Sequence, residues 1–191
     1  MRLSKVVIVL AVIFLIAGLS QAQVYIGVQG GLGFSSFEDQ DKGATGIPLG
    51  ATIGTDLLPI LDVGAEAMFM VSPYKFDATD GSETEIKQNF YGAYVRWYVL
   101  PLPAITPYIK GGVAYYSGKW DFRSDDYGTG TDLKGSVGFN IGAGVDFLMG
   151  LYGEVVYHIV SHEIDMEGLP AELSGSKGYN SIQVTIGYTI L

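Results

Sequence analysis

The sequence contains no cysteine and only two histidines among its 191 residues. The absence of cysteine excludes a disulfide scaffold, a thiolate-bound zinc ion, a cysteine nucleophile and lipid attachment at a cysteine. Charge is also scarce, because 16% of the residues are charged, against about 25% in an average soluble domain. The 11 basic residues are outnumbered by 20 acidic ones. No nucleic-acid partner is expected, since phosphate binding needs a basic face.

The sequence is instead rich in apolar residues and glycine. Apolar residues make up 48% of the chain, 27 residues are glycine, and the mean hydropathy is +0.29. The glycines follow no three-residue period, which excludes a collagen-like helix. The length fits one domain, since domains usually contain about 100–200 residues. We therefore expect one folded domain in surroundings unlike those of an ordinary cytosolic protein.

The first 22 residues have the layout of a secretory signal peptide. A short basic region, residues 1–5, precedes an unbroken apolar run from Val6 to Ala17, and Ser20-Gln21-Ala22 is a small-x-small cleavage sequence. The apolar run is shorter than the ~20 residues that a membrane-spanning helix needs. We predict cleavage after Ala22, which leaves residues 23–191 as a single mature domain.

From residue 23 onward, apolar and polar side chains alternate with a period of two, which is the pattern of β-strands. Long polar connections and short apolar ones join the segments in turn, and the number of segments is even. Short turns at one end of a sheet and long loops at the other are typical of an up-and-down barrel in the outer membrane. The expected strands are Gln23–Ser35, Gly46–Asp56, Leu61–Ser72, Lys87–Val99, Thr106–Gly118, Lys134–Phe147, Leu151–His162 and Gly178–Leu191.

The direction in which the apolar face points indicates whether water or lipid surrounds this barrel. In the last strand, Ile182, Val184 and Ile186 alternate with Gln183 and Thr185. A soluble, lipocalin-like barrel turns its apolar face inward, whereas a membrane barrel turns it to lipid. The polar faces here carry mostly Gly, Ser, Thr, Gln and Asn, rather than the Lys and Glu that keep an outer wall soluble. We therefore expect a membrane barrel, with a soluble lipocalin-like binder of an apolar ligand as the less favoured alternative.

This arrangement resembles the small OmpA/OmpX-type outer-membrane β-barrel proteins. Besides the strand count, the resemblance rests on glycine-and-aromatic motifs such as Tyr25-Ile26-Gly27-Val28 and Ile186-Gly187-Tyr188. It implies an all-β fold, an eight-stranded antiparallel up-and-down transmembrane β-barrel, in the outer membrane of a Gram-negative-type bacterium. It also implies a monomer that the barrel-assembly machinery inserts among outer-membrane lipids and lipopolysaccharide. Family members often end in an aromatic residue, whereas here Tyr188 stands three places before the final Leu191.

Four charged residues fall within the expected strands on the polar face: Glu66, Arg96, Lys110 and Glu154. Counted from the short-turn end, they lie at similar depth, and the first three occupy successive strands. Because a buried charge needs a partner of opposite sign, we predict an interior ion-pair cluster. In similar barrels such a cluster blocks or gates a narrow lumen. Two roles therefore stay open, a structural filling of the interior and the gating of a narrow pore for ions or small solutes.

The four long connections hold 15 of the 20 acidic residues. The densest group, expected in one extracellular loop, consists of Asp121, Asp125, Asp126 and Asp132. Carboxylate oxygens are ligands for Ca²⁺, but the spacing matches no calcium-loop motif. We predict no metal site. The loops are expected to form a solvated exterior or to present an acidic surface to an extracellular partner.

Neither histidine suits a catalytic role. Some outer-membrane barrels are lipid A deacylases, which use a His and a Ser two residues apart on one strand face. Here Ser161 stands three residues from His158 and one from His162, so strand alternation puts the hydroxyl on the opposite face from both rings. The nucleophile–base hydrogen bond is then hard to make. We predict no catalytic residue, no cofactor and no enzymatic activity, and a structural or loop-mediated interaction role instead.

Overall fold

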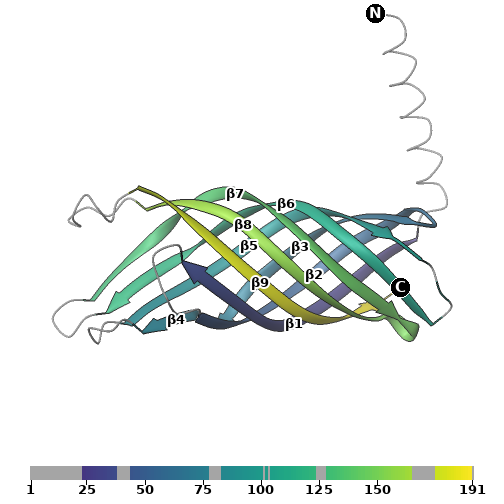
Figure 1. Cartoon of the computed structure of the whole chain (residues 1–191), viewed down its shortest axis with the longest axis horizontal. Coiled ribbons are helices and arrows are strands. Elements are labelled where there is room, and N and C mark those ends of the chain that lie inside the picture. The colour runs from purple at the N-terminus through teal and green to yellow at the C-terminus, as the bar shows by residue number, and fades with distance from the viewer. Residues whose placement is uncertain are drawn as a thin grey trace, which may run out of the picture.

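The computed structural model describes residues 23–37, 44–77, 83–100, 102, 104–123, 128–164 and 175–190. The expected signal peptide, residues 1–22, lies outside these ranges. Long strands run diagonally around a cylinder, with the long connections at one end and the short turns at the other (Figure 1). None of the helices in the described ranges has the length and hydropathy of a membrane-spanning helix.

The described part of the chain consists almost entirely of β-strands. One 3-10 turn, η1 (Leu148–Gly150), joins two of them at the short-turn end. The strands are β1 (Val24–Phe37), β2 (Ala44–Leu58), β3 (Leu61–Ser72), β4 (Tyr74–Asp77), β5 (Glu83–Tyr98), β6 (Ile105–Arg123), β7 (Gly128–Phe147), β8 (Leu151–Ile164) and β9 (Gly175–Ile190).

The sheet closes on itself through antiparallel pairs. The first strand, β1, pairs with β2 on one side and with the last strand, β9, on the other. The third strand, β3, pairs with β5, and β4 continues along the same partner beyond Pro73. Proline cannot donate to a strand ladder, so it divides what is one wall strand into β3 and β4. The closed, eight-stranded antiparallel barrel expected from the sequence is confirmed.

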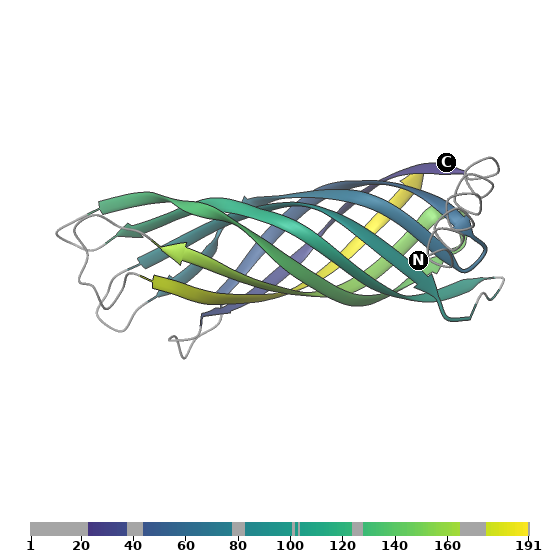
Figure 2. The ribbon, with the colours of Figure 1, turned by 90° about the horizontal axis from the view of Figure 1, so that it is seen from above.

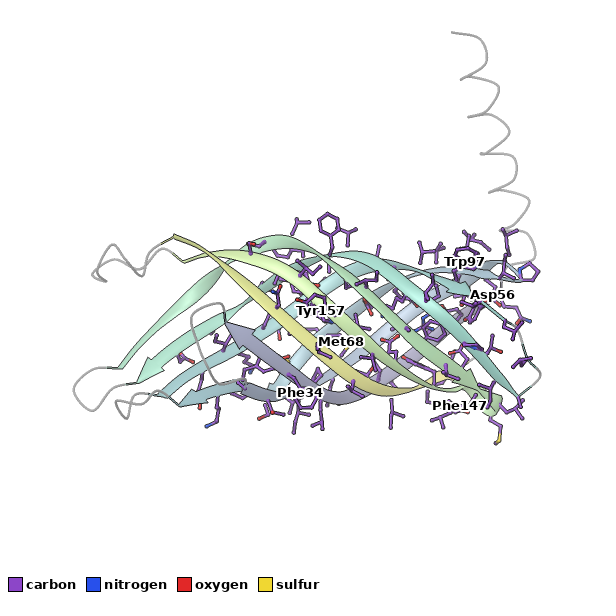
Figure 3. All side chains as sticks on the ribbon, in the orientation of Figure 1. Phe34, Asp56, Met68, Trp97, Phe147 and Tyr157 are labelled. Carbon is purple, nitrogen blue, oxygen red and sulfur yellow. The ribbon has the colours of Figure 1, made fainter. Side chains whose placement is uncertain are left out.

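Strand alternation turns the apolar side chains outward. Ile26 on β1 is 54% exposed and Ile186 on β9 is 66% exposed, whereas their polar-face neighbours Gln29 and Gln183 are buried. Trp97 and Phe147 project from the outside of the barrel near its short-turn end (Figure 3). This apolar outer wall is the arrangement expected for a barrel in lipid. It is opposite to that of a soluble, lipocalin-like cup.

The strands at the long-loop end extend further than the sequence predicts. The expected loop between residues 119 and 133 is largely strand, because β6 continues to Arg123 and β7 begins at Gly128. Figure 2 shows these strands reaching far out at the end opposite the short turns. On the outward face of β6, the apolar residues end at Tyr115 and polar residues such as Lys119 and Asp121 follow, although the backbone ladder continues to Arg123. The apolar outward face therefore ends before the strand does.

A glycine at the β1–β9 seam is in close contact with the neighbouring backbone. A Cβ atom on Gly31 would collide with the carbonyl oxygen of Val184, which cannot move without disturbing the ladder. On the adjacent Gly30, a Cβ atom would meet only the end of the Leu49 side chain, which can rotate. We expect Gly31→Ala to lower the free energy of unfolding by about 1–3 kcal/mol, the usual cost of overpacking.

Urea unfolding of the refolded protein in lipid vesicles, followed by the heat-dependent gel shift, measures this effect. Gly30→Ala is the matched control and should unfold close to the wild type. Equal unfolding midpoints for the two variants would show that the seam tolerates the extra methyl group.

Candidate functional site

The interior next to the short turns holds charged side chains from four strands. Glu66 lies on β3, Arg96 on β5, Lys110 on β6 and Glu154 on β8, and each is at most 4% exposed. Arg96 and Lys110 are direct partners across the β5–β6 ladder. All four occupy inward-facing strand positions. The structure thus brings the four residues of the predicted cluster together.

Lys110 lies at the centre of this cluster. Its Nζ atom is 2.6 Å from Glu66 Oε2 and 3.0 Å from Glu154 Oε1. A guanidinium nitrogen of Arg96 is 3.5 Å from the other Glu154 oxygen, which also accepts a hydrogen bond of 3.0 Å from the Tyr108 hydroxyl. Two cations and two carboxylates therefore balance one another. Such mutual compensation is what makes buried charge tolerable.

Three tyrosine rings surround the Arg96 guanidinium. Its central carbon is 5.0 Å from the ring centroid of Tyr94, 4.8 Å from that of Tyr108 and 5.0 Å from that of Tyr152. Cation–π contacts of this kind are worth about 0.5–2 kcal/mol each. The sequence analysis missed these tyrosines, yet the signal was present. Each stands two residues from a predicted charged residue, and residues two apart share a strand face.

A second polar group lies closer to the short turns. The Tyr98 hydroxyl is 2.5 Å from Asp62 Oδ2 and 2.9 Å from Asp146 Oδ2. A phenol carries one proton, so Tyr98 can donate only one of these bonds, and the other requires a proton on a carboxyl group. Tyr25 donates to the same Asp62 oxygen over 3.3 Å. In the described ranges, no group of three or more His, Cys, Asp or Glu residues could hold a metal ion.

Toward the long loops, the interior contains a cluster of apolar side chains. Phe90 packs against Tyr116 and His158, with ring centroids 5.5 Å and 4.8 Å apart, and the Tyr116 hydroxyl is 2.8 Å from His158 Nδ1. We refer to the cluster of buried apolar side chains at this level as the apolar layer. We refer to Glu66, Arg96, Lys110 and Glu154, together with Tyr94, Tyr108 and Tyr152, as the charged layer. The apolar layer consists of Ala44, Met68, Met70, Tyr74, Ile86, Phe90, Ala114, Tyr116 and Val160.

The sequence analysis did not identify the apolar layer. Met68 and Met70 share a strand face with Glu66, and Phe90 shares one with Arg96, so alternation alone places them inside. Met68 lies further from the short turns than Asp56 does (Figure 3). Besides the apolar layer, this part of the interior also holds buried polar side chains such as Gln88 and His158.

The predicted acidic group does not lie in one loop. Asp121 is an exposed residue of β6, and the backbone of Asp132 belongs to β7, where it is opposite Lys119. Asp125 and Asp126 lie outside the described residues. The two described members therefore belong to a protruding β-hairpin, because these strands extend beyond the predicted ends.

The structure also places two of the three residues considered for catalysis. His158 is buried inside the barrel, whereas Ser161 is exposed on the outer face. The side chain of the third residue, His162, lies outside the described part of the structure. Ser161 and His158 therefore lie on opposite sides of the β8 strand, as strand alternation requires.

Comparisons with known proteins give one family and one fold. The family model described as outer membrane protein beta-barrel domain matches residues 7–189. No curated protein matches the chain. Neisserial surface protein A has a similar structure, with a TM-score of 0.63 at 13% sequence identity, over 88% of this chain and 97% of that chain.

Two further solved structures are similar. Ail of Yersinia pestis, in complex with the heparin analogue sucrose octasulfate, has a TM-score of 0.53 at 14% identity, over 88% of this chain and 99% of that one. A major outer membrane protein from Thermus thermophilus has a TM-score of 0.52 at 13% identity, over 88% of this chain and 100% of that one. At such identities the likeness concerns the fold.

Proposed function

Because the chain belongs to the outer membrane protein beta-barrel domain family, we propose that it is a structural, non-conducting barrel whose long-loop end contacts partners outside the cell. Its location is the outer membrane of a Gram-negative-type bacterium. The observation that carries the proposal is the filled interior. The charged layer and the apolar layer follow one another along the barrel axis.

Each layer opposes ion passage in a different way. In the charged layer, an entering ion has to displace Lys110 or Arg96 from carboxylates that they neutralise. In the apolar layer, bulky side chains such as Met68 and Phe90 occupy the interior, so an ion has to shed its water to pass, which is costly. An eight-stranded barrel has room inside only for side chains. These arguments favour structural filling over the narrow pore, which remains the alternative.

Planar-bilayer recording of the purified wild-type protein tests this proposal. We expect no stable channel steps at neutral pH, because buried side chains of both layers occupy the interior. A heat-dependent gel shift on the same preparation establishes that the barrel is folded. Reproducible steps from folded protein would favour the pore.

The outward-reaching β6–β7 hairpin supports a role in binding. The chain carries a formal net charge of −9, and Asp121 is exposed on the hairpin. Sucrose octasulfate, the compound in the Ail structure, is a polyanion, which this acidic chain would repel. A cationic partner is therefore the better match in charge.

Vesicles containing the protein are expected to bind polylysine and not heparin. The binding should weaken several-fold between low and physiological salt, because exposed charges are screened. Protein-free vesicles of the same lipids are the control. Heparin binding without polylysine binding would contradict the assignment of a cationic partner.

The remaining features of the proposal follow from the family and the signal sequence. We propose cleavage after Ala22, insertion by the barrel-assembly machinery, and a monomer surrounded by outer-membrane lipids and lipopolysaccharide. We also propose that the protein is not an enzyme and needs no cofactor. The opposite orientations of His158 and Ser161 support that part of the proposal.

A further inference from the structure

The short turns of this barrel are apolar on their outer side. Met149 in η1 is 88% exposed and the preceding Leu148 is 64% exposed. The other two turns carry exposed leucine, isoleucine and valine side chains in the same way. We call this set the short-turn rim, and it consists of Leu58, Ile60, Val99, Leu100, Leu102, Leu148 and Met149.

Turns that lie in water are normally rich in polar residues and glycine, and large exposed apolar patches mark contact surfaces. The acidic residues at this end do not belong to the rim. Asp62 and Asp146 are bound by Tyr98 inside the barrel. Asp56 is exposed, but it is opposite Asp62 in the β2–β3 ladder and shares a strand face with the buried Thr52, so it lies at the lumen mouth. Among the described residues, the outer side of the rim thus carries no charge.

The rim is continuous with the lipid-facing wall. Outward-facing apolar residues extend along β6 from Ile105 to Tyr115 and along β7 from Val137 to Phe147. Each run covers about eleven residues, and a tilted strand needs ~9–11 to cross the hydrocarbon. The hydrocarbon therefore reaches the strand ends at the short turns.

The opposite end of the wall is different. Beyond Tyr115, the next outward positions on β6 are Ser117 and Lys119, and β6 continues to Arg123. Polar strand residues thus form a margin outside the membrane on the long-loop side. No such margin separates the apolar band from the described turns on the other side.

We propose that the short-turn rim is embedded among the acyl chains at the inner-leaflet boundary of the outer membrane. The barrel is then displaced outward. Its short-turn end is flush with the membrane, and the lumen mouth with Asp56 is the part of this end that meets water. The occupant is phospholipid, because the rim continues a surface that lipid already covers. This inference requires the membrane location but not a closed lumen, so a conducting barrel would leave it intact.

The lack of cysteine in the chain makes the test direct. Met149→Cys and Leu100→Cys place single thiols on two different turns of the rim. Asp56→Cys is the control at the same end, on the lumen side, and Lys87→Cys is the control on the outer face beyond the apolar band. Each thiol carries an environment-sensitive fluorophore. The labelled proteins are inserted into phosphatidylethanolamine and phosphatidylglycerol vesicles, and the gel shift verifies that each is folded.

Fluorophores at Met149→Cys and Leu100→Cys are expected to emit at shorter wavelength than the two controls. They should be quenched strongly by nitroxides on the lipid acyl chains, and several-fold less than the controls by iodide in the water. Because the two variants lie on different turns, one of them still tests the proposal if the other fails to fold. Iodide quenching of both rim sites at the level of Lys87→Cys would overturn the proposal. Protection in native outer membranes but not in vesicles would assign the rim to a protein partner and overturn it as well.

Discussion

Lys110→Met is expected to destabilise the barrel by about 3–5 kcal/mol, the usual cost of leaving a buried charge without its partner. Lys110 contacts both Glu66 and Glu154, and its side chain is 1% exposed. Methionine fills a similar volume without the charge. Arg96 then remains paired with Glu154, whereas Glu66 keeps only the Asn140 amide, so one negative charge stays uncompensated inside the barrel.

The double variant Glu66→Gln, Lys110→Met separates charge balance from packing. It removes one charge of each sign and leaves Glu154 with Arg96 and Tyr108, so we expect it to recover most of the stability lost by the single variant. Lys87→Met, on the exposed outer face, is the control for the substitution itself. Urea unfolding in vesicles measures all three. Equal losses in the single and double variants would mean that charge imbalance is not the cause.

Phe90→Ala is expected to cost about 3–5 kcal/mol, as truncation of a buried phenylalanine usually does. Phe90 is 3% exposed and its ring packs against Tyr116 and His158. These neighbours are fixed on β6 and β8, so they cannot close around the space that the ring leaves. The resulting cavity loses van der Waals contacts on several sides.

Tyr91→Ala is the matched control, because Tyr91 is the next residue and is 46% exposed on the outer face. Mobile acyl chains can occupy the volume that this ring leaves, so a smaller loss is expected there. A loss at position 91 as large as that at position 90 would contradict the distinction between packed interior and lipid-facing wall.

Strand alternation accounts for how much of the structure could be predicted. It assigns every second residue to the interior once the apolar face is placed in lipid, so it selected Glu66, Arg96, Lys110 and Glu154 as inward residues. The same rule places Tyr152 and Phe90 inside, although aromatic and apolar residues are expected on the outside of a membrane barrel. The positions of these interior aromatic residues are therefore predictable from the sequence.

Other features could not be read from the pattern. The pairing of Lys110 with two carboxylates, and of Arg96 with three rings, depends on the stagger between neighbouring strands, which single-strand periodicity does not report. The ends of β6 and β7 depend on backbone pairing beyond the apolar band, where outward residues such as Asp121 are exposed. The outward residues there are polar, so the pattern of a lipid-facing strand ends before the ladder does.

The closed lumen is the central claim, and single-channel recording of layer variants tests it most directly. Arg96→Ala with Glu154→Ala thins the charged layer while keeping the charge balanced, and Met70→Ala with Phe90→Ala thins the apolar layer. The wild type and each pair are compared in the same bilayers, after the gel shift has shown that they are folded. We expect no stable steps from the wild type or from either pair, because the other layer still closes the barrel. Steady channel steps from the folded wild type would contradict the closed lumen, and steps from a single pair would contradict two barriers in series.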